Sequence, residues 1–184
     1  EAERRRQAYS DKLAQKSLFQ EKLEELHQDY VSLVVSTDPQ SRGYRLEKLL
    51  VQLFDLFDLD PKAAFRVTGE QIDGAFTYGD ADYLVEAKWQ DKPVRAADLD
   101  ALAGKVRRKL DNTLGLYLSI SGFSQGGVEA HSSGRRLLLL MDGSDLLAVL
   151  EGRIDLPDLL LRKRRHAAQI GEIYLTYRDM VQAS

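Results

Sequence analysis

Apolar and polar residues alternate along residues 71–89, and this alternation is the strongest local signal in the chain. At period two, one face of the second half of this stretch is wholly apolar and consists of Tyr83, Val85, Ala87 and Trp89. The opposite face carries Leu84, Glu86 and Lys88. The first half divides in the same way, and its polar face carries a single carboxylate, that of Asp73. The pattern predicts two half-buried strands, each with charged side chains on one face.

A Gly-Asp pair at residues 79–80 separates the two runs, and glycine at the first central position suits a two-residue type II′ hairpin loop. With this loop, Tyr78 pairs with Ala81, and Asp73 lies directly opposite Glu86. Directly opposed side chains have Cβ atoms roughly 4.5–5.5 Å apart, and like charges placed so repel each other. The hairpin therefore predicts two carboxylates that need a cation between them.

A longer loop over residues 79–82 would instead place Asp73 opposite Lys88, with Glu86 on the diagonal. All three charged side chains stay clustered in either register. Mg²⁺ takes oxygen ligands, commonly one or two carboxylates, and fills its remaining positions with water and phosphate oxygens. The cluster therefore predicts a magnesium site that Lys88 can reach.

A long amphipathic helix is expected over residues 1–35, which contain neither Gly nor Pro. Its apolar residues recur at spacings of four and three, at Phe19, Leu23, Leu26, Tyr30 and Leu33. The repeat is too short to establish a coiled coil. The helix either packs on its own domain, leads to a further domain or pairs with a second copy of the chain.

A second helix is expected over residues 41–57, with Glu47 on a largely apolar side. An unpaired carboxylate is costly on such a face. Glu47 therefore either reaches solvent at the edge of that face or turns toward Asp73 and Glu86 as a further ligand.

The rest of the chain alternates between short apolar runs and helical segments. Strands are expected at residues 63–68, 114–121, 135–141 and 173–177, and helices at residues 95–110, 124–131, 144–150 and from Asp155 to the basic run 162–166. Strands separated by helices pair in parallel through crossover connections, whereas the hairpin is antiparallel. The pattern predicts an α/β fold with a mixed sheet flanked by helices.

Composition narrows the class of protein. The chain is 43% hydrophobic and 30% charged, as is typical of a soluble globular protein, and it has no cysteine for disulfides or thiolate zinc sites. No apolar run approaches the roughly 20 residues of a membrane span, and no signal-peptide pattern is present, so a cytoplasmic location and no membrane partner are expected. The first residue is Glu1 rather than Met, which suggests that further domains or subunits belong to this protein.

The net charge of −3 gives no overall attraction to nucleic acid, so any such contact must come from local patches. The helix at residues 95–110 carries Lys105, Arg107, Arg108 and Lys109. This basic run forms either a solvated helix face or a surface that contacts phosphates.

The order of a helix with Glu47, strands with Asp73 and with Glu86-Ala87-Lys88, a helix and a buried strand resembles the PD-(D/E)XK nuclease superfamily. More narrowly, the chain is similar to the Mrr-type restriction endonuclease catalytic domain. The segments that carry the likeness are residues 42–47, 71–74, 85–88, 119–124 and 139–143. The resemblance implies a restriction-endonuclease-like fold, an αβββαβ core, in a nuclease domain at residues 37–184 preceded by a helical segment at residues 1–36 that is a linker or a dimerisation element.

The resemblance also implies roles for individual residues. Asp73 and Glu86 would bind Mg²⁺, which Mn²⁺ could replace, with the Ala87 carbonyl as a backbone ligand and Glu47 completing the site. Lys88 would orient the attacking water or help to deprotonate it. Arg42 and Arg45, together with Lys105, Arg107 and Arg108, would contact DNA.

The resulting hypothesis is a Mg²⁺-dependent DNA endonuclease that acts in restriction or phage defence, as a homodimer or larger homo-oligomer. A junction resolvase or an RNA nuclease would use the same residues. A catalytically silent nucleic-acid-binding or assembly module is the alternative from a different class, but such a module has no need to keep Asp73, Glu86 and Lys88 together.

Overall fold

The computed structural model describes residues 1–67 and 69–183. Its elements, in chain order, are α1 (Ala2–Val34), α2 (Pro39–Leu56), β1 (Lys62–Val67), β2 (Glu70–Tyr78), β3 (Ala81–Lys88), α3 (Ala96–Arg107), β4 (Thr113–Ser119), α4 (Gln125–His131), β5 (Leu138–Asp142), α5 (Gly143–Leu150), α6 (Leu156–Gln169) and α7 (Tyr177–Gln182). Among these described residues, no helix is both long enough and apolar enough to cross a membrane.

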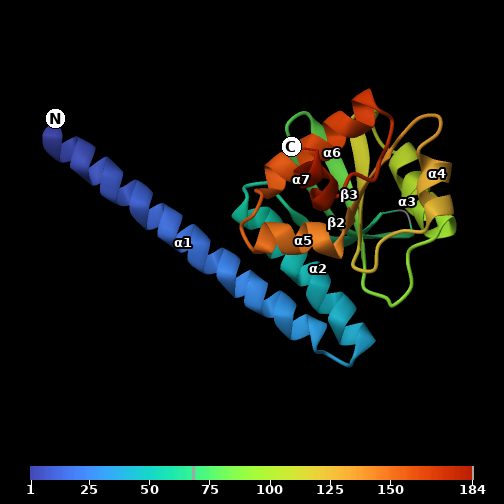
Figure 1. Cartoon of the computed structure of the whole chain (residues 1–184), viewed down its shortest axis with the longest axis horizontal. Coiled ribbons are helices and arrows are strands. Elements are labelled where there is room, and N and C mark those ends of the chain that lie inside the picture. Colours follow the sequence, from blue (N-terminus) through green and yellow to red (C-terminus); the bar gives the residue numbers. More distant parts are fainter. Residues whose placement is uncertain (68, 184) are drawn as a thin grey trace.

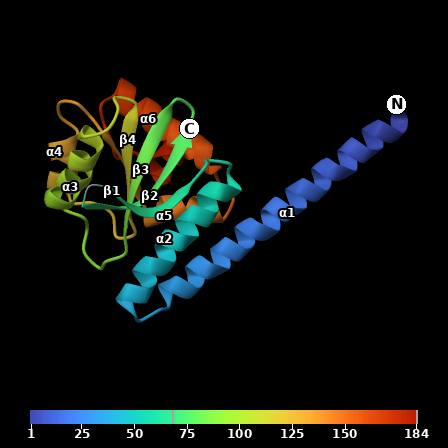
Figure 2. The same cartoon turned by 180° about the vertical axis from the view of Figure 1, so that it is seen from behind.

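The five strands form one mixed sheet in the order β1-β2-β3-β4-β5 (Figure 2). The pairs β1–β2 and β2–β3 are antiparallel, whereas β3–β4 and β4–β5 are parallel. Parallel neighbours need a crossover connection, and the segments with α3 and α4 supply these two crossovers. The prediction of an α/β fold with a mixed sheet flanked by helices is confirmed.

The hairpin adopts the two-residue loop. Tyr78 pairs with Ala81, and the register continues to Gly74 opposite Val85. Gly79 has a φ of 62°, a left-handed conformation that glycine adopts at little cost and that a type II′ turn requires at this position. The register therefore brings Asp73 and Glu86 to the next positions along the two strands.

Each face of the sheet has its own hydrophobic core. The helices α1, α2, α5, α6 and α7 cover one face, where they pack against Tyr83, Val85 and Leu116. On the opposite face, α3 packs against Leu84 and Tyr117. Figure 1 shows α3 and α4 together on one side of the domain and α1 with α2 on the other.

Ile72 and Phe76 lie four residues apart on β2, a spacing that places two residues on one face of a regular strand, yet they pack in different cores. Ile72 packs in the core beneath α3, whereas Phe76 packs on the opposite side of the sheet. The pairing of β2 with β3 stops at Gly74, whereas its pairing with β1 continues to Glu70, so the two ends of β2 have different neighbours.

The expected N-terminal helix is present, and its two halves have different surroundings. The second half packs on the domain through Leu23, Leu26, Tyr30 and Leu33, all of which are buried. The first half is exposed and extends away from the rest of the chain (Figure 1). Helix α2 begins at Pro39, two residues earlier than expected, because the Asp38 side chain accepts the backbone N–H groups of Gln40 and Ser41.

The C-terminal segment differs from the expectation. Residues 173–177 form no strand, although the Leu140 N–H donates a hydrogen bond to the Ile173 carbonyl at the edge of β5. Thr176 and Asp179 form a capping box that begins α7 at Tyr177. Helix α6 also continues past the basic run 162–166 and ends at Gln169.

Candidate active site

Asp73 is fixed at the point where β2 and β3 cease to pair. Its Oδ2 atom accepts the Ala87 N–H at 3.3 Å, so a side-chain carboxylate takes a backbone donor beyond the last regular pair. Glu86, on β3, precedes that donor by one residue, and both carboxylates are partly exposed. The predicted proximity of Asp73 and Glu86 is consistent with this geometry.

Helix α3 supplies partners to both charged side chains of the Glu86-Ala87-Lys88 segment. The Lys105 ammonium lies 2.9 Å from Glu86 Oε2, and the Lys88 ammonium binds the Asp98 carboxylate. Asp98 is also the third residue of its helix and accepts the Arg95 backbone N–H. Sequence reasoning missed Asp98, although an acidic residue three positions after a helix start is a recognisable capping signal.

The three carboxylates influence one another electrostatically. Burial raises the pKa of Asp73, and the negative charge of Glu86 raises it further, while the Ala87 N–H and the two lysines oppose this effect. Burial also raises the pKa of Glu47, with additional effects from Asp73 and Glu86. The charges of Asp73 and Glu86 thus act on Glu47, and its role as a further ligand stays a prediction.

The donor chemistry of this cluster suits a hard divalent cation, for which carboxylate oxygens are the preferred ligands. In the described part of the chain, no three acidic or histidine side chains are already arranged to hold a metal. Tyr117, opposite Glu86 on β4, is buried, and its hydroxyl finds no hydrogen-bond partner among the described residues.

The carboxylates of the site also affect the pKa of Tyr117. Burial raises its pKa, and the charges of Glu86, Asp98 and Asp73 raise it further. Its ring meets Phe123 edge to face, which fixes the orientation of the phenol in the core beneath α3. Only the position of Tyr117 in a continuous apolar strand could be read from the sequence.

The basic residues predicted to contact DNA occupy two places. On α2, the Arg42 guanidinium lies over the Trp89 ring at 5.2 Å, and Arg45 donates a hydrogen bond to Ser32 Oγ at 2.6 Å. At the C-terminal end of α3, Arg107 is exposed and Arg108 pairs with Glu70. Lys105 differs from these residues, because its ammonium faces Glu86 and its side chain is only 18% exposed.

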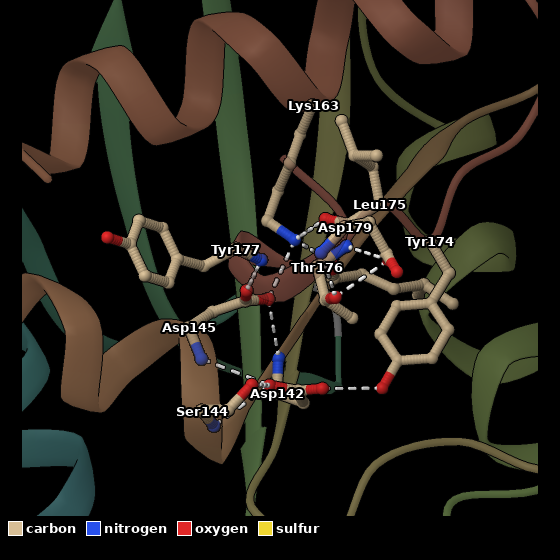
Figure 3. A network of polar contacts seen from close by, with 10 residues as sticks. Asp142, Ser144, Asp145, Lys163, Tyr174, Leu175, Thr176, Tyr177 and Asp179 are labelled. Carbon is tan, nitrogen blue, oxygen red and sulfur yellow. Dashed lines mark hydrogen bonds and ion pairs between the residues drawn. The ribbon is translucent and has the colours of Figure 1, made fainter. Parts of the chain in front are cut away.

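A second polar cluster lies between β5, α5, α6 and the C-terminal segment (Figure 3). The Lys163 ammonium binds Asp145 at 2.7 Å and the Leu140 carbonyl at 2.8 Å, and it also binds the Leu175 carbonyl. The sequence interpretation placed Lys163 in a basic helix end, which was wrong, because a lysine at this position on α6 points into the core. The cluster fastens the C-terminal segment onto β5.

The mixed sheet with carboxylates and a lysine on adjacent strands defines an α/β domain of the restriction-endonuclease-like class. The chain belongs to the restriction endonuclease family Mrr_cat, whose family model matches residues 40–150. The resemblance expected from the sequence is confirmed, and family membership supports a nuclease.

Solved structures similar to this chain include the "Protein of Unknown Function AF1548", at 17% identity and a TM-score of 0.49 over 77% of this chain and 84% of that one. The "DNA modification-dependent restriction endonuclease AspBHI" is 18% identical with a TM-score of 0.44, over 78% of this chain and 38% of that one. The "MspJI Restriction Endonuclease in Complex with 27-mer Oligonucleotide" is 21% identical with a TM-score of 0.42, over 82% of this chain and 35% of that one. No curated protein matches the chain significantly.

Proposed function

We propose that this domain is a Mg²⁺-dependent endonuclease that hydrolyses DNA phosphodiester bonds. The observation that carries the proposal is that Asp73, Glu86 and Lys88 lie on two adjacent strands, where the Asp73 carboxylate accepts the Ala87 N–H between the other two residues. The charges of Asp73 and Glu86 also raise the pKa of Glu47. The restriction endonuclease family to which the chain belongs supports the same activity.

Asp73 and Glu86 would hold the cation, with Glu47 and the Ala87 carbonyl as additional ligands. When bound, a divalent ion polarises a phosphoryl oxygen, lowers the pKa of a bound water and stabilises the leaving alkoxide. Lys88 would orient the attacking water through its ammonium; only as a neutral amine, released from Asp98, would it accept that water's proton. The Asp98 carboxylate, which binds the Lys88 ammonium, would hold that side chain in position.

DNA would lie across the end of strands β2 and β3 at which Asp73 and Glu86 are placed. Arg42 and Arg45 on α2, together with Arg107 and Arg108 near the end of α3, would contact its phosphates, because guanidinium groups bind phosphate oxygens through paired N–H donors. We extend the proposal to a role in restriction or phage defence and to a cytoplasmic location. Substrate competition between duplex DNA, junction DNA and RNA tests the choice of nucleic acid.

We further propose a homodimer or larger homo-oligomer, because two active sites can cut both strands of a duplex in one binding event. The exposed first half of α1, within the segment at residues 1–36, is available to serve as a linker or as a dimerisation element. Equilibrium sedimentation with and without DNA tests this point. A monomer under both conditions contradicts it.

Cleavage of plasmid DNA with Mg²⁺ or Mn²⁺ tests the activity. We expect cation-dependent nicking by the wild-type chain and its loss in both Lys88→Ala and Asp73→Ala. Lys92→Ala and Asp91→Ala are matched controls, because these residues are exposed and lie just beyond the same strand. Equal activity in all five proteins, or no activity in any of them under either cation, contradicts the proposal.

A further inference from the structure

Helix α3 neutralises the acidic half of the candidate site with a lysine of its own. Lys105 Nζ lies 2.9 Å from Glu86 Oε2, and the two side chains are 18% and 20% exposed. Water therefore screens this ion pair less than it would screen a surface pair. Lys105 is a cation already bound to one of the two carboxylates that would hold a metal.

The charges around Glu86 explain this arrangement. Asp73 and Glu47 both experience the negative charge of Glu86, and each has a raised pKa. A nearby ammonium relieves this repulsion, and its charge acts on Asp73 as well as on Glu86. In the described residues the acidic groups do not converge on one point, while Glu86 is turned toward Lys105.

We propose that Lys105 competes with the divalent cation for Glu86, so that the lysine sets the affinity of the site for the cation. This inference rests on the proposed function, because it takes Glu86 as a ligand. Lysine suits the role, since its ammonium is a compact charge on a flexible stem and can leave the carboxylate without movement of the helix. Lys105 is a positioning residue in this scheme and touches neither the ion nor the substrate.

Mn²⁺ titration of the full chain without DNA, followed by the electron paramagnetic resonance signal of free Mn²⁺, measures this competition directly. We expect Lys105→Met to bind Mn²⁺ about tenfold more tightly than the wild type, because the ammonium that lies 2.9 Å from Glu86 Oε2 is gone and no longer competes for that carboxylate. Lys105→Arg keeps the charge and should stay within about twofold of the wild type.

Arg107→Met is the matched control, because it removes one positive charge from the same helix at an exposed position. Tightening by Arg107→Met equal to that by Lys105→Met would show a general charge effect and overturn the proposal. Equal or weaker binding by Lys105→Met overturns it too, as does the lack of Mn²⁺ binding in every variant. Lys105→Gln provides a second neutral variant if circular dichroism shows that Lys105→Met is misfolded.

The readout separates this inference from the proposed nuclease activity. If the wild type cuts plasmid and Lys105→Met has the same affinity for Mn²⁺ as the wild type, the competition is rejected and the nuclease activity is retained. Tighter Mn²⁺ binding by Lys105→Met in a chain that cuts no plasmid rejects the nuclease and retains the competition.

Discussion

Lys163 Nζ lies 2.7 Å from Asp145 Oδ2, and both side chains are completely buried. The pair is well satisfied, because Lys163 also binds the Leu140 and Leu175 carbonyls and the Tyr177 N–H donates to Asp145 Oδ1 at 2.6 Å. These contacts offset the cost of removing two charges from water, so the intact pair adds less to stability than its short distances suggest.

Breaking this pair should destabilise the chain strongly. We expect Lys163→Met to lower the free energy of unfolding by about 3–5 kcal/mol, because it leaves Asp145 buried without a counter-ion. Thermal or urea unfolding measures the change. Arg162→Met, which removes an exposed pair with Asp158 on the same helix, should cost less than about 1 kcal/mol. Equal melting temperatures for wild type and Lys163→Met would contradict the prediction.

Asp73 should reduce stability at neutral pH. Its folded-state pKa is raised, so the stability it contributes is present below the unfolded pKa of about 3.9 and is lost as the pH rises through the folded pKa. Asn carries no charge and can still accept the Ala87 N–H. We expect Asp73→Asn to melt roughly 2 °C above the wild type at pH 7.

This gain should shrink as the pH falls toward 4, since the raised pKa of Asp73 makes the folded wild type take up a proton before the unfolded chain does. Melting curves recorded at both pH values without divalent cations test the sign. Asp91→Asn is the control, because Asp91 is exposed. A lower melting temperature for Asp73→Asn at pH 7 would show that the carboxylate is stabilising instead.

Glu47 should influence cleavage without being indispensable. It lies on α2, outside the hairpin, and is linked to Asp73 and Glu86 through their charges. We expect Glu47→Gln to reduce the cleavage rate about 10- to 100-fold, as is typical of residues that support a metal site. Asp55→Asn, an exposed change on the same helix, should leave the rate unchanged. Loss of activity as complete as that of Asp73→Ala would instead make Glu47 an essential ligand.

Arg107 should contribute to DNA binding through phosphate contact alone. Fluorescence anisotropy with duplex DNA over a series of salt concentrations should show that Arg107→Gln binds every DNA sequence more weakly. The slope of log binding constant against log salt concentration should be smaller by about one. Arg153→Gln is the control, because this arginine is exposed and lies in the loop between α5 and α6. An unchanged slope would remove Arg107 from the interface.

The two halves of α1 should respond differently to substitution. Leu33 is 1% exposed, and Leu33→Ala should cost about 2–5 kcal/mol because it leaves a cavity in the core. Leu13 is 50% exposed, so Leu13→Ala should leave the free energy of unfolding within about 0.5 kcal/mol of the wild type. A large loss from Leu13→Ala would reveal that the first half of the helix is buried by a partner.

Local pattern was sufficient for the hairpin and for the helices around it. The Gly79-Asp80 turn and the alternation of residues 81–89 specified the register that brings Asp73 toward Glu86, because neighbouring strands joined by a tight turn have little freedom to slip. The helix α2 was expected in the right place, but its start was set two residues late, because the Asp38 side chain caps a helix that begins at Pro39.

Tertiary structure decided which groups neutralise these charges. Asp98 and Lys105 meet Lys88 and Glu86 only because α3 packs across β3, and Lys163 is buried only because α6 turns that side of its helix toward Asp145. Residues 173–177 have the composition of a strand, yet the capping box of α7 and the bonds to Lys163 determine their path. The sequence by itself determined the five strands of the sheet and the turn that sets the register of Asp73 and Glu86, whereas the ion pairs depend on packing between segments far apart in the chain, which local periodicity does not encode.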